Sequence, residues 1–414
     1  MSAVTPACDL ADPESVVTTL LHGEPLALED PYPLYAAMRE NAPIHRSEEH
    51  GLWVVSRYAD VMAALRHPGM SMAAGLLADP RYDTSAALQM FGGSMLFCDD
   101  PAAHSRERRL VRQAFTRQTV QGLRDSTQRL VDELLDRCAQ SRTFDYMNDF
   151  VEHVPVAVIC RMLGVPEADI ATFAEWNELI TTGTGAVVSD EHMARVDGAA
   201  ESLAAYLAEL LEQRRANPGD DLLSKLIEAR DGSDQLSAQE TLNMAFLLLA
   251  AGSDTTAAFL GAATVALLRN PDQLALLRER RELLPNAIEE LLRFEAPVHF
   301  GIMRTVTEPL TLGEVEIPVG ERVWTILSAG NRDPRRFDDP DRLDVTREQV
   351  RHLGFAQGMH MCLGAMLARM ESEVVLGAVL DRFSSLTLEQ DPIPWINHGN
   401  LRRIGRLDVA AEVA

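Results

Sequence analysis

Apolar residues recur every three or four positions over most of this chain, a spacing that predicts helices. The helical patterns cover residues 31–40, 58–66, 118–141, 150–163, 167–182, 190–215, 237–269, 272–282 and 285–295, and another starts at Leu363. Alternating or short apolar runs predict strands at 44–56, 310–326, 386–388 and 405–409. The pattern therefore favours a mainly α-helical fold with small β-sheets (α+β).

No Pro/Gly/Ser-rich linker, low-complexity block or internal repeat divides the 414 residues. One large domain therefore fits the sequence as well as several domains do. We expect the N-terminal segment, residues 1–28, to be loosely ordered. Residues 70–100 show no clear period, which is typical of a functional loop.

The charge balance limits the possible partners. The formal net charge is −24, and a surface of that sign repels nucleic acid and anionic membranes, so we expect neither as a partner. The five cysteines are widely spaced and no signal peptide is evident, which indicates a reducing, cytoplasmic location. The run 244–268 is apolar enough to cross a membrane, but it contains Asp254 and therefore reads as a buried helix.

One cysteine, Cys362, lies at the start of the helix that begins at Leu363. A helix N-terminus favours a thiolate, and a thiolate can hold iron, including haem iron. Gly358 suits a backbone that passes close to a flat group, and His360 could direct a donor at an anion beside it. Taken alone, Cys362 fits an inert buried cysteine better.

Two further stretches carry candidate chemistry. His104 and Arg108 are four residues apart and share one helix face, where they could clamp carboxylates or form an ordinary solvated surface. Gly252 weakens a long helix by about 1 kcal/mol, as if something must lie against it. Beside it, Asp254 and Thr255 could pass protons from solvent to a buried reactant. The alternative there is a packing notch with an ion-paired aspartate.

Taken together, the motifs resemble those of the bacterial cytochromes P-450, which are soluble haem-thiolate monooxygenases, over nearly the whole chain. The motifs are, in chain order, HSRERR at 104–109, AGSDTT at 251–256, E-x-x-R at 290–293, NRDP with FDDPDRLD at 331–344, and FAQGMHMCLG at 355–364. The resemblance implies the cytochrome P-450 fold, as a single large haem domain over residues 29–414, and a haem b cofactor (iron protoporphyrin IX). It also implies the insertion of one oxygen atom of O2 into a C–H bond, by hydroxylation or epoxidation.

The resemblance assigns roles to individual positions. Cys362 matches the axial ligand of the haem iron, and Phe355 the aromatic residue beside it. The residues matched to haem propionate binding are His104, Arg108, Arg304 and His360, and Gly358 and Ala251 match positions against the cofactor and its bound oxygen. Asp254 and Thr255 match an acid–alcohol pair that delivers protons.

Glu290 and Arg293 match a structural pair that supports the cysteine loop, with a partner in 331–344. From their spacing alone, an ordinary surface pair of little energetic value would be the simpler interpretation. The sequence departs from the family at Ala356, where glycine is usual. If that position needs a positive φ, alanine strains it.

The resemblance also suggests a substrate class and partners. We expect an apolar substrate pocket lined by Met95, Leu96, Ile180, Ala250, Val298, Phe300, Ile302 and Leu401. Such a pocket suits a mid-sized hydrophobic substrate, and by analogy a polyketide-, macrolide- or terpene-tailoring step such as those of antibiotic biosynthesis. Without a flavin or iron–sulfur motif, electrons must come from a ferredoxin with its reductase or from a flavoprotein, and we expect a monomer. A peroxide-driven peroxygenase and a non-catalytic haem sensor or carrier are the alternatives, and the Asp254–Thr255 pair argues against both.

Overall fold

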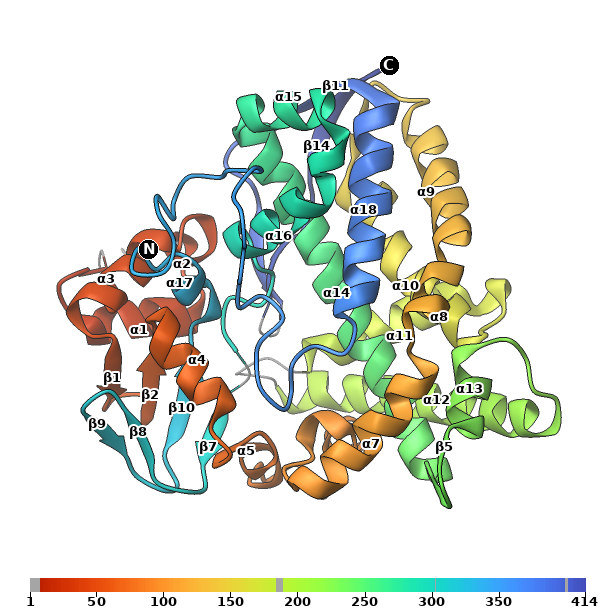
Figure 1. The fold of residues 1–414 in the computed structure, drawn as a ribbon, viewed down its shortest axis with the longest axis horizontal. Helices are drawn as coiled ribbons and strands as arrows, with labels where there is room; N and C mark the ends of the chain where they lie inside the picture. Colours follow the sequence, from red (N-terminus) through yellow and green to blue (C-terminus); the bar gives the residue numbers. More distant parts are fainter. Residues whose placement is uncertain (1–7, 184–188, 302, 399–400) are drawn as a thin grey trace.

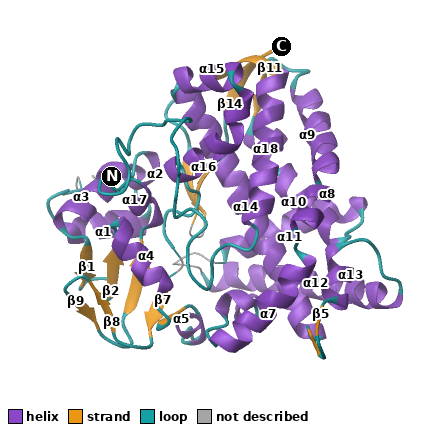
Figure 2. Cartoon of the chain, in the orientation of Figure 1, coloured by secondary structure: helices purple, strands orange, loops and turns teal. Residues whose placement is uncertain are grey.

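The computed structural model describes residues 8–183, 189–301, 303–398 and 401–414. Helices predominate, and the strands gather in small sheets (Figure 2). The main helices of the larger, helical part are α7 (Pro101–Ala114), α8 (Arg117–Gly122), α9 (Arg124–Cys138), α10 (His153–Leu163), α11 (Ile170–Thr182), α12 (Asp190–Ala216), α13 (Leu222–Glu228), α14 (Ala238–Arg269), α15 (Pro271–Glu279), α16 (Leu284–Phe294) and α18 (Ala365–Arg382). They form the right-hand part of Figure 1 and enclose the largest apolar core. The mainly α fold with small sheets is confirmed.

The N-terminal residues and the segment 303–331 form a smaller β-containing part on the left of Figure 1. Its elements are α1 (Pro13–His22), α2 (Pro25–Glu29), α3 (Tyr32–Asn41), β1 (Ile44–Ser47), β2 (Leu52–Val55), α4 (Tyr58–Arg66), β3 (Met70–Ser71), β7 (Arg304–Val306), β8 (Leu310–Leu312), β9 (Val315–Ile317), β10 (Arg322–Thr325) and α17 (Leu327–Asn331). The main sheet has the order β1-β2-β10-β7-β3, with β10 parallel to β2 and the other pairs antiparallel.

The remaining elements are short. They are α5 (Ala73–Leu77), α6 (Ala86–Gly92), the 3-10 turns η1 (Met95–Phe97), η3 (Glu167–Asp169) and η4 (Arg281–Leu283), the π-helical turn η2 (Met147–Val151), and β4 (Thr143–Asp145), β5 (Arg230–Asp231), β6 (Asp234–Gln235), β11 (Phe383–Leu388), β12 (Trp395–His398), β13 (Leu401–Ile404) and β14 (Asp408–Val413). The stretch without a clear period, 70–100, thus contains β3 and three short helical elements. The hairpin β12–β13 packs against the long helix α14.

The N-terminal segment differs from the expectation of loose order. In α1, the side chain of Asp12 accepts hydrogen bonds from the backbone of Glu14 and Ser15, and the helix ends at Gly23 with φ 61°. Val16, Val17 and Leu20 are buried in the core of the β-containing part. The expectation is therefore wrong for residues 8–28. The Asp-Pro start and the glycine stop were readable signals for this helix.

Helix α14 is the axis of the helical part. It begins with a capping box, in which Ser237 and Glu240 each accept a hydrogen bond from the other's backbone. At 32 residues it is about 48 Å long. It is the one described helix apolar and long enough to cross a membrane, but 83% of its apolar window is buried within the molecule. This agrees with its prediction as a core helix.

The loop that carries Cys362 is tied to the core by a buried ion pair. Arg293 and Glu290 have no exposed side-chain surface, so the interpretation as a surface pair of little value is wrong. Arg293 donates to the carbonyls of Asn331 (3.0 Å) and Pro340 (2.7 Å), and the side chain of Asn331 accepts from the backbone of Leu353 at 2.7 Å. Removal of one partner from such a pair costs about 3–5 kcal/mol, because the other charge stays buried.

Within the loop, Ala356 has φ 52° and Gly358 has φ 80°. Ala356 thus has the positive φ that would strain an alanine, and this conformation costs about 1 kcal/mol or more. At Gly358, a Cβ would lie 2.6 Å from the carbonyl oxygen of Leu65, at the end of α4. The backbone of α4 therefore requires this glycine, a reason that the sequence did not suggest.

We predict that Ala356→Gly raises the free energy of unfolding by up to about 1 kcal/mol, because relief of the strain outweighs the added chain entropy of glycine. Urea titration of both proteins measures the change. The control is Ala368→Gly inside α18, which should lose about 1 kcal/mol. A similar loss from Ala356→Gly would contradict the strain.

A second prediction concerns Glu371 on α18, which is 1% exposed and whose Oε2 has no hydrogen-bond partner among the described residues. Burial raises the pKa of its carboxyl from 4.5 to about 8. The folded state therefore binds this proton more tightly than the unfolded state does. The contribution of Glu371 to the free energy of unfolding is fully present below pH 4.5 and is lost as the pH rises towards 8. Glu371→Gln should reduce this pH slope, measured by urea unfolding at several pH values. Glu373→Gln on the same helix should keep the wild-type slope, and equal slopes in all three proteins would refute the prediction.

Candidate functional site

Cys362 lies between the loop and the first turn of α18. Its backbone N–H donates to the carbonyl of Phe355 at 2.9 Å. Burial raises the pKa of its thiol, whereas backbone N–H groups of Gly364 and Ala365 and the charge of Arg108 act in the opposite direction. The helix start alone thus does not produce the thiolate that the sequence led us to expect. A metal ion at the sulfur would, because it deprotonates a coordinating thiol outright.

The side chain of Cys362 is nevertheless exposed on one side, and so is Ala251. Ala251 lies in the middle of α14, where Leu249 and Ala250 are buried. An exposed residue in the middle of a core helix means that protein side chains do not cover this face of α14. Cys362 and Ala251 therefore both present surface that a ligand can reach.

Four nitrogen-bearing side chains form a cluster near the cysteine loop. His104 and Arg108 come from α7, Arg304 from β7, and His360 from the loop itself. The rings of His104 and His360 are 4.9 Å apart between centroids and meet edge to face. Arg108 donates to the loop carbonyls of Met359 (3.3 Å) and Met361 (2.6 Å). The predicted propionate residues thus converge from three parts of the chain.

Two members of this cluster are buried, and none of the four forms an ion pair with a carboxylate among the described residues. His104 is 2% exposed and Arg304 is 5% exposed. Nε2 of His104 and both ring nitrogens of His360 are buried without a hydrogen-bond partner among the described residues. Burial, followed by the charges of Arg304 and His104, lowers the pKa of His360 to about 4, and burial lowers the pKa of Arg304 to about 10. Buried donors of this kind need acceptors.

The donor set and the thiol together fit a haem. Its two propionates would supply acceptors for the four donors, and its iron would take the sulfur of Cys362 as a soft ligand. A side chain at Gly358 would collide with the backbone of α4, so the glycine allows the loop to pack against that helix.

Phe355 is partly buried beside the cysteine, and a residue that the sequence did not single out covers it. The guanidinium of Arg369 on α18 lies 4.6 Å from the centre of the Phe355 ring. Arg369 pairs with Glu289 (2.6 Å), which also contacts His352 (3.3 Å). Although burial opposes it, these two hydrogen bonds lower the pKa of Glu289 to about 2. Arg369 was predictable in part, because it lies on the first turns of the helix after Cys362.

On α14, the hydroxyl of Thr255 donates to the carbonyl of Ala251, four residues earlier, at 2.9 Å. Gly252 has a different role from the one expected. A Cβ there would lie 3.0 Å from Ile159 on α10, so the glycine allows α10 to pack closely. The side of the helix open to a ligand is that of Ala251.

Asp254 is held in a polar network away from Thr255. Its Oδ1 accepts from Asn177 (2.9 Å) and its Oδ2 from Thr181 (2.7 Å), both on α11. Nε2 of His398 lies 3.2 Å from Oδ2, and the guanidinium of Arg403 lies 3.8 Å from it. Burial acts to raise the pKa of Asp254, but the hydrogen bonds from His398 and Thr181 and the charge of Arg403 outweigh it and lower the pKa. The ion-paired aspartate is therefore present, alongside the acid–alcohol sequence.

The structure does not bring all predicted pocket residues together. Met95 in η1, Ile180 on α11 and Ala250 on α14 are buried in the large core, and Leu96 and Val298 are partly buried. Ile302 lies outside the described residues.

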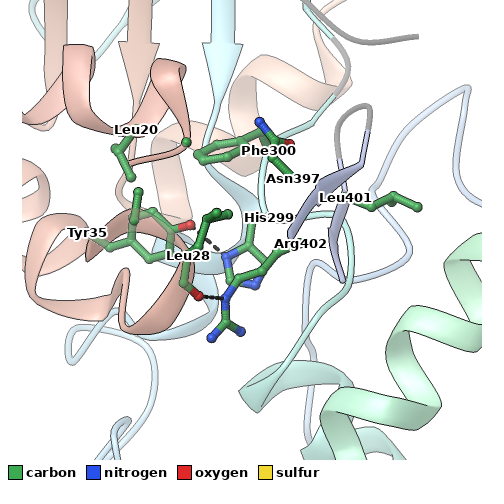
Figure 3. A pocket seen from close by; sticks show the side chains of 10 residues that line it. Leu20, Leu28, Tyr35, His299, Phe300, Asn397, Leu401 and Arg402 are labelled. Carbon is green, nitrogen blue, oxygen red and sulfur yellow. Dashed lines mark hydrogen bonds between the residues drawn. The ribbon is translucent and has the colours of Figure 1, made fainter. Parts of the chain in front are cut away.

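Phe300 and Leu401 instead line a small pocket beside the N-terminal helices (Figure 3). The Phe300 ring packs on Trp324 at 4.2 Å between centroids, and Tyr35 bonds to His299 at 2.6 Å beside it. In Figure 3 the side chain of Leu401 points away from Tyr35, His299 and Phe300. Phe300 packs against the core of the β-containing part, and its placement in one pocket with Met95 and Ile180 stays a prediction.

Known proteins resemble the whole chain. A sequence model of the family described as Cytochrome P450 matches residues 176–410. Cytochrome P450 107B1 of Saccharopolyspora erythraea is 39% identical over 387 residues, which cover 91% of this chain and 93% of that protein. The 6-deoxyerythronolide B hydroxylase of the same organism is 37% identical over 398 residues, covering 92% and 96%.

A solved structure agrees over the same length. P450BioI, in complex with an acyl carrier protein ligated to hexadec-9Z-enoic acid, has a TM-score of 0.87 and 30% identity and covers 93% of this chain and 99% of that one. Sequence identity of this extent, the matching fold, and a thiol beside a cluster of buried donors all point to one conclusion. The chain belongs to the cytochrome P450 family, whose members are haem b-containing monooxygenases.

Proposed function

We propose that this cytochrome P450 holds its haem through Cys362 and through His104, Arg108, Arg304 and His360, and that it oxidises a mid-sized hydrophobic small molecule. The observation that carries the proposal is the buried, unpartnered ring nitrogens of His104 and His360 beside the reachable thiol of Cys362. These atoms have no acceptor among the described protein groups, and two ligand carboxylates would provide one for each donor.

Haem bound at this site would supply oxygen activation, in which one atom of O2 is inserted into a C–H bond and the other leaves as water, with two electrons and two protons consumed. The chain's own residues stabilise the thiolate and supply the protons. Arg369 and Arg108 place positive charge near the sulfur and stabilise its thiolate. Thr255 holds a hydroxyl on the open side of α14 and can pass a proton there. Asp254 supplies that proton once it releases at least one of its present partners, because its carboxylate is directed at α11 and the β12–β13 hairpin.

The substrate is proposed to be a polyketide- or macrolide-like molecule. Two features support this class. Met95, Ile180 and Ala250 are apolar and come from η1, α11 and α14, and a relative of 37% identity is named as a hydroxylase of 6-deoxyerythronolide B. A spectral screen for the low-spin to high-spin shift, comparing macrolactones, terpenes and fatty acids, tests it. The largest shift with macrolactones supports the class, and a shift only with terpenes or fatty acids refutes it.

Electrons are proposed to come from a separate ferredoxin with its reductase or from a flavoprotein, in the cytoplasm, to a monomeric enzyme. Met361 and Met366 are 43% and 41% exposed beside Cys362, and Arg112 is exposed on α7 nearby. We propose that these residues belong to the surface on which the electron donor docks. Arg109 pairs with Asp231 and therefore contributes less to this docking surface. Turnover with hydrogen peroxide but not with a reductase system would favour a peroxygenase instead.

The CO-difference spectrum tests the iron ligand. Reduced wild-type protein should show the red-shifted Soret band of a thiolate-ligated haem, and Cys362→Ala should lose it, because Cys362 is the cysteine of the loop that carries His360. Cys98→Ala is the control and should keep the band. A red shift that survives in Cys362→Ala would remove Cys362 from the iron.

Thr255→Ala tests proton delivery. We expect product formed per NADPH to fall about tenfold or more while NADPH consumption continues, since a lost proton donor slows only the productive branch. The matched control is Thr256→Ala, because Thr256 is 6% exposed and donates to Gly252 at 3.0 Å. Coupling should stay near the wild-type value in Thr256→Ala, and an unchanged value in Thr255→Ala would exclude Thr255 from the path.

A further inference from the structure

The carboxylate of Asp254 is almost shut off from solvent, at 12% exposure, yet a proton donor must be refilled after each turnover. Its partners are Asn177, Thr181, His398 and Arg403. An asparagine amide does not titrate, and an arginine does not release its proton in proteins. Among these partners, only histidine takes up and gives back protons near neutral pH.

His398 has two short routes to the acid. Its Nε2 lies 3.2 Å from Oδ2 of Asp254 and 3.1 Å from the hydroxyl of Thr181. That hydroxyl in turn lies 2.7 Å from the same Oδ2. A proton can therefore move from the ring to the carboxylate directly, or through the hydroxyl, over ordinary hydrogen-bond distances.

The other charges around this pair suit a histidine relay better than a carboxylate relay. Glu152 pairs with Arg403 and is 26% exposed, so it meets solvent more than His398 at 11%. Arg403, however, is the group through which Glu152 reaches Asp254, and a guanidinium does not hand protons on. Burial raises the pKa of Glu152, with the nearby Asp254 and Glu178 acting in the same direction against Arg403. Glu152 thus balances the charge of Arg403.

We propose that His398, at the end of β12, is the proton entry to Asp254: its ring takes a proton from solvent and gives the Nε2 proton to Oδ2, so that Asp254 becomes the neutral acid that serves Thr255. The step moves one proton and changes no oxidation state. The proposal rests on the proposed function, because it supplies the same acid–alcohol pair. It also gives the C-terminal hairpin a part in catalysis that its sequence did not suggest.

The decisive variant is His398→Gln. Glutamine can still donate a hydrogen bond to Asp254 but cannot exchange protons with solvent. We expect product per NADPH to fall severalfold and the solvent deuterium isotope effect on coupling to increase. The pH dependence of coupling should flatten, because glutamine has no titrating group in place of the imidazole. His192→Gln is the matched control, since His192 on α12 bonds at 2.6 Å to Thr182, the neighbour of Thr181 on α11, and is not among the partners of Asp254 given above.

A readout independent of turnover tests the contact itself. Urea midpoints of the holoenzyme, its His398→Gln and Asp254→Asn variants and the double variant should be non-additive, as expected for groups in direct contact. Additive midpoints would overturn the contact, and a wild-type coupling and pH profile in His398→Gln would overturn the relay. If Thr255→Ala uncouples while His398→Gln does not, the relay fails and the proposed function stands. If the thiolate CO band is absent from the wild type, the proposed function itself fails.

Discussion

The burial of Arg293 is the constraint on which the cysteine loop depends. Its guanidinium has no exposed surface, so each of its N–H groups must find an acceptor inside the protein. Glu290 supplies one set, and the carbonyls of Asn331, Pro340 and Arg342 supply the other. The polar, turn-rich segment that precedes the cysteine is therefore held in place by hydrogen bonds to the side chain of Arg293. The side-chain oxygen of Asn331 accepts a hydrogen bond from the backbone of Leu353, and this contact connects the segment to the cysteine loop.

The second electrostatic feature of the cysteine loop is the cluster of hydrogen-bond donors formed by His104, Arg108, Arg304 and His360. Donors from α7, β7 and the loop converge without an ion pair to a carboxylate among the described residues. Burial lowers the pKa of both His360 and Arg304, and the charges of Arg304 and His104 add to the shift at His360, while the charge of Asp99 opposes it at both groups. In this arrangement the protein alone bears an electrostatic cost that a dicarboxylate ligand removes. We infer that the free energy of binding a haem comes in part from satisfying these donors, in addition to the bond between iron and Cys362.

The acid on α14 shows how a site and its support share residues. Asp254 connects α14 with α11 and with the β12–β13 hairpin, so the network that keeps it ionised also joins three parts of the fold. An aspartate held this firmly is a poor proton donor until a partner yields. The structural and catalytic interpretations of this residue are therefore compatible, and the exchangeable proton of His398 is what links them.

The sequence by itself determined what depends on neighbours along the chain. Helical periodicity, the capping box at Ser237, the Thr255-to-Ala251 hydrogen bond and the position of Cys362 before α18 all follow from spacings of a few residues. The family motifs extended this to the cofactor and to the four donors. The N-terminal helix α1 carried local signals as well, in its Asp-Pro start and its glycine stop, and these were overlooked.

Only the tertiary structure decided which distant segments meet. The partners of Asp254 lie 73 to 149 residues away in sequence, and no periodicity predicts such pairs. The full burial of Glu290 and Arg293, the carbonyl of Leu65 that excludes a side chain at Gly358, and the packing of Phe300 on Trp324 likewise depend on how elements stack. The physical reason is that backbone hydrogen bonds set local structure over a few residues, whereas burial and charge pairing are properties of the whole packed chain.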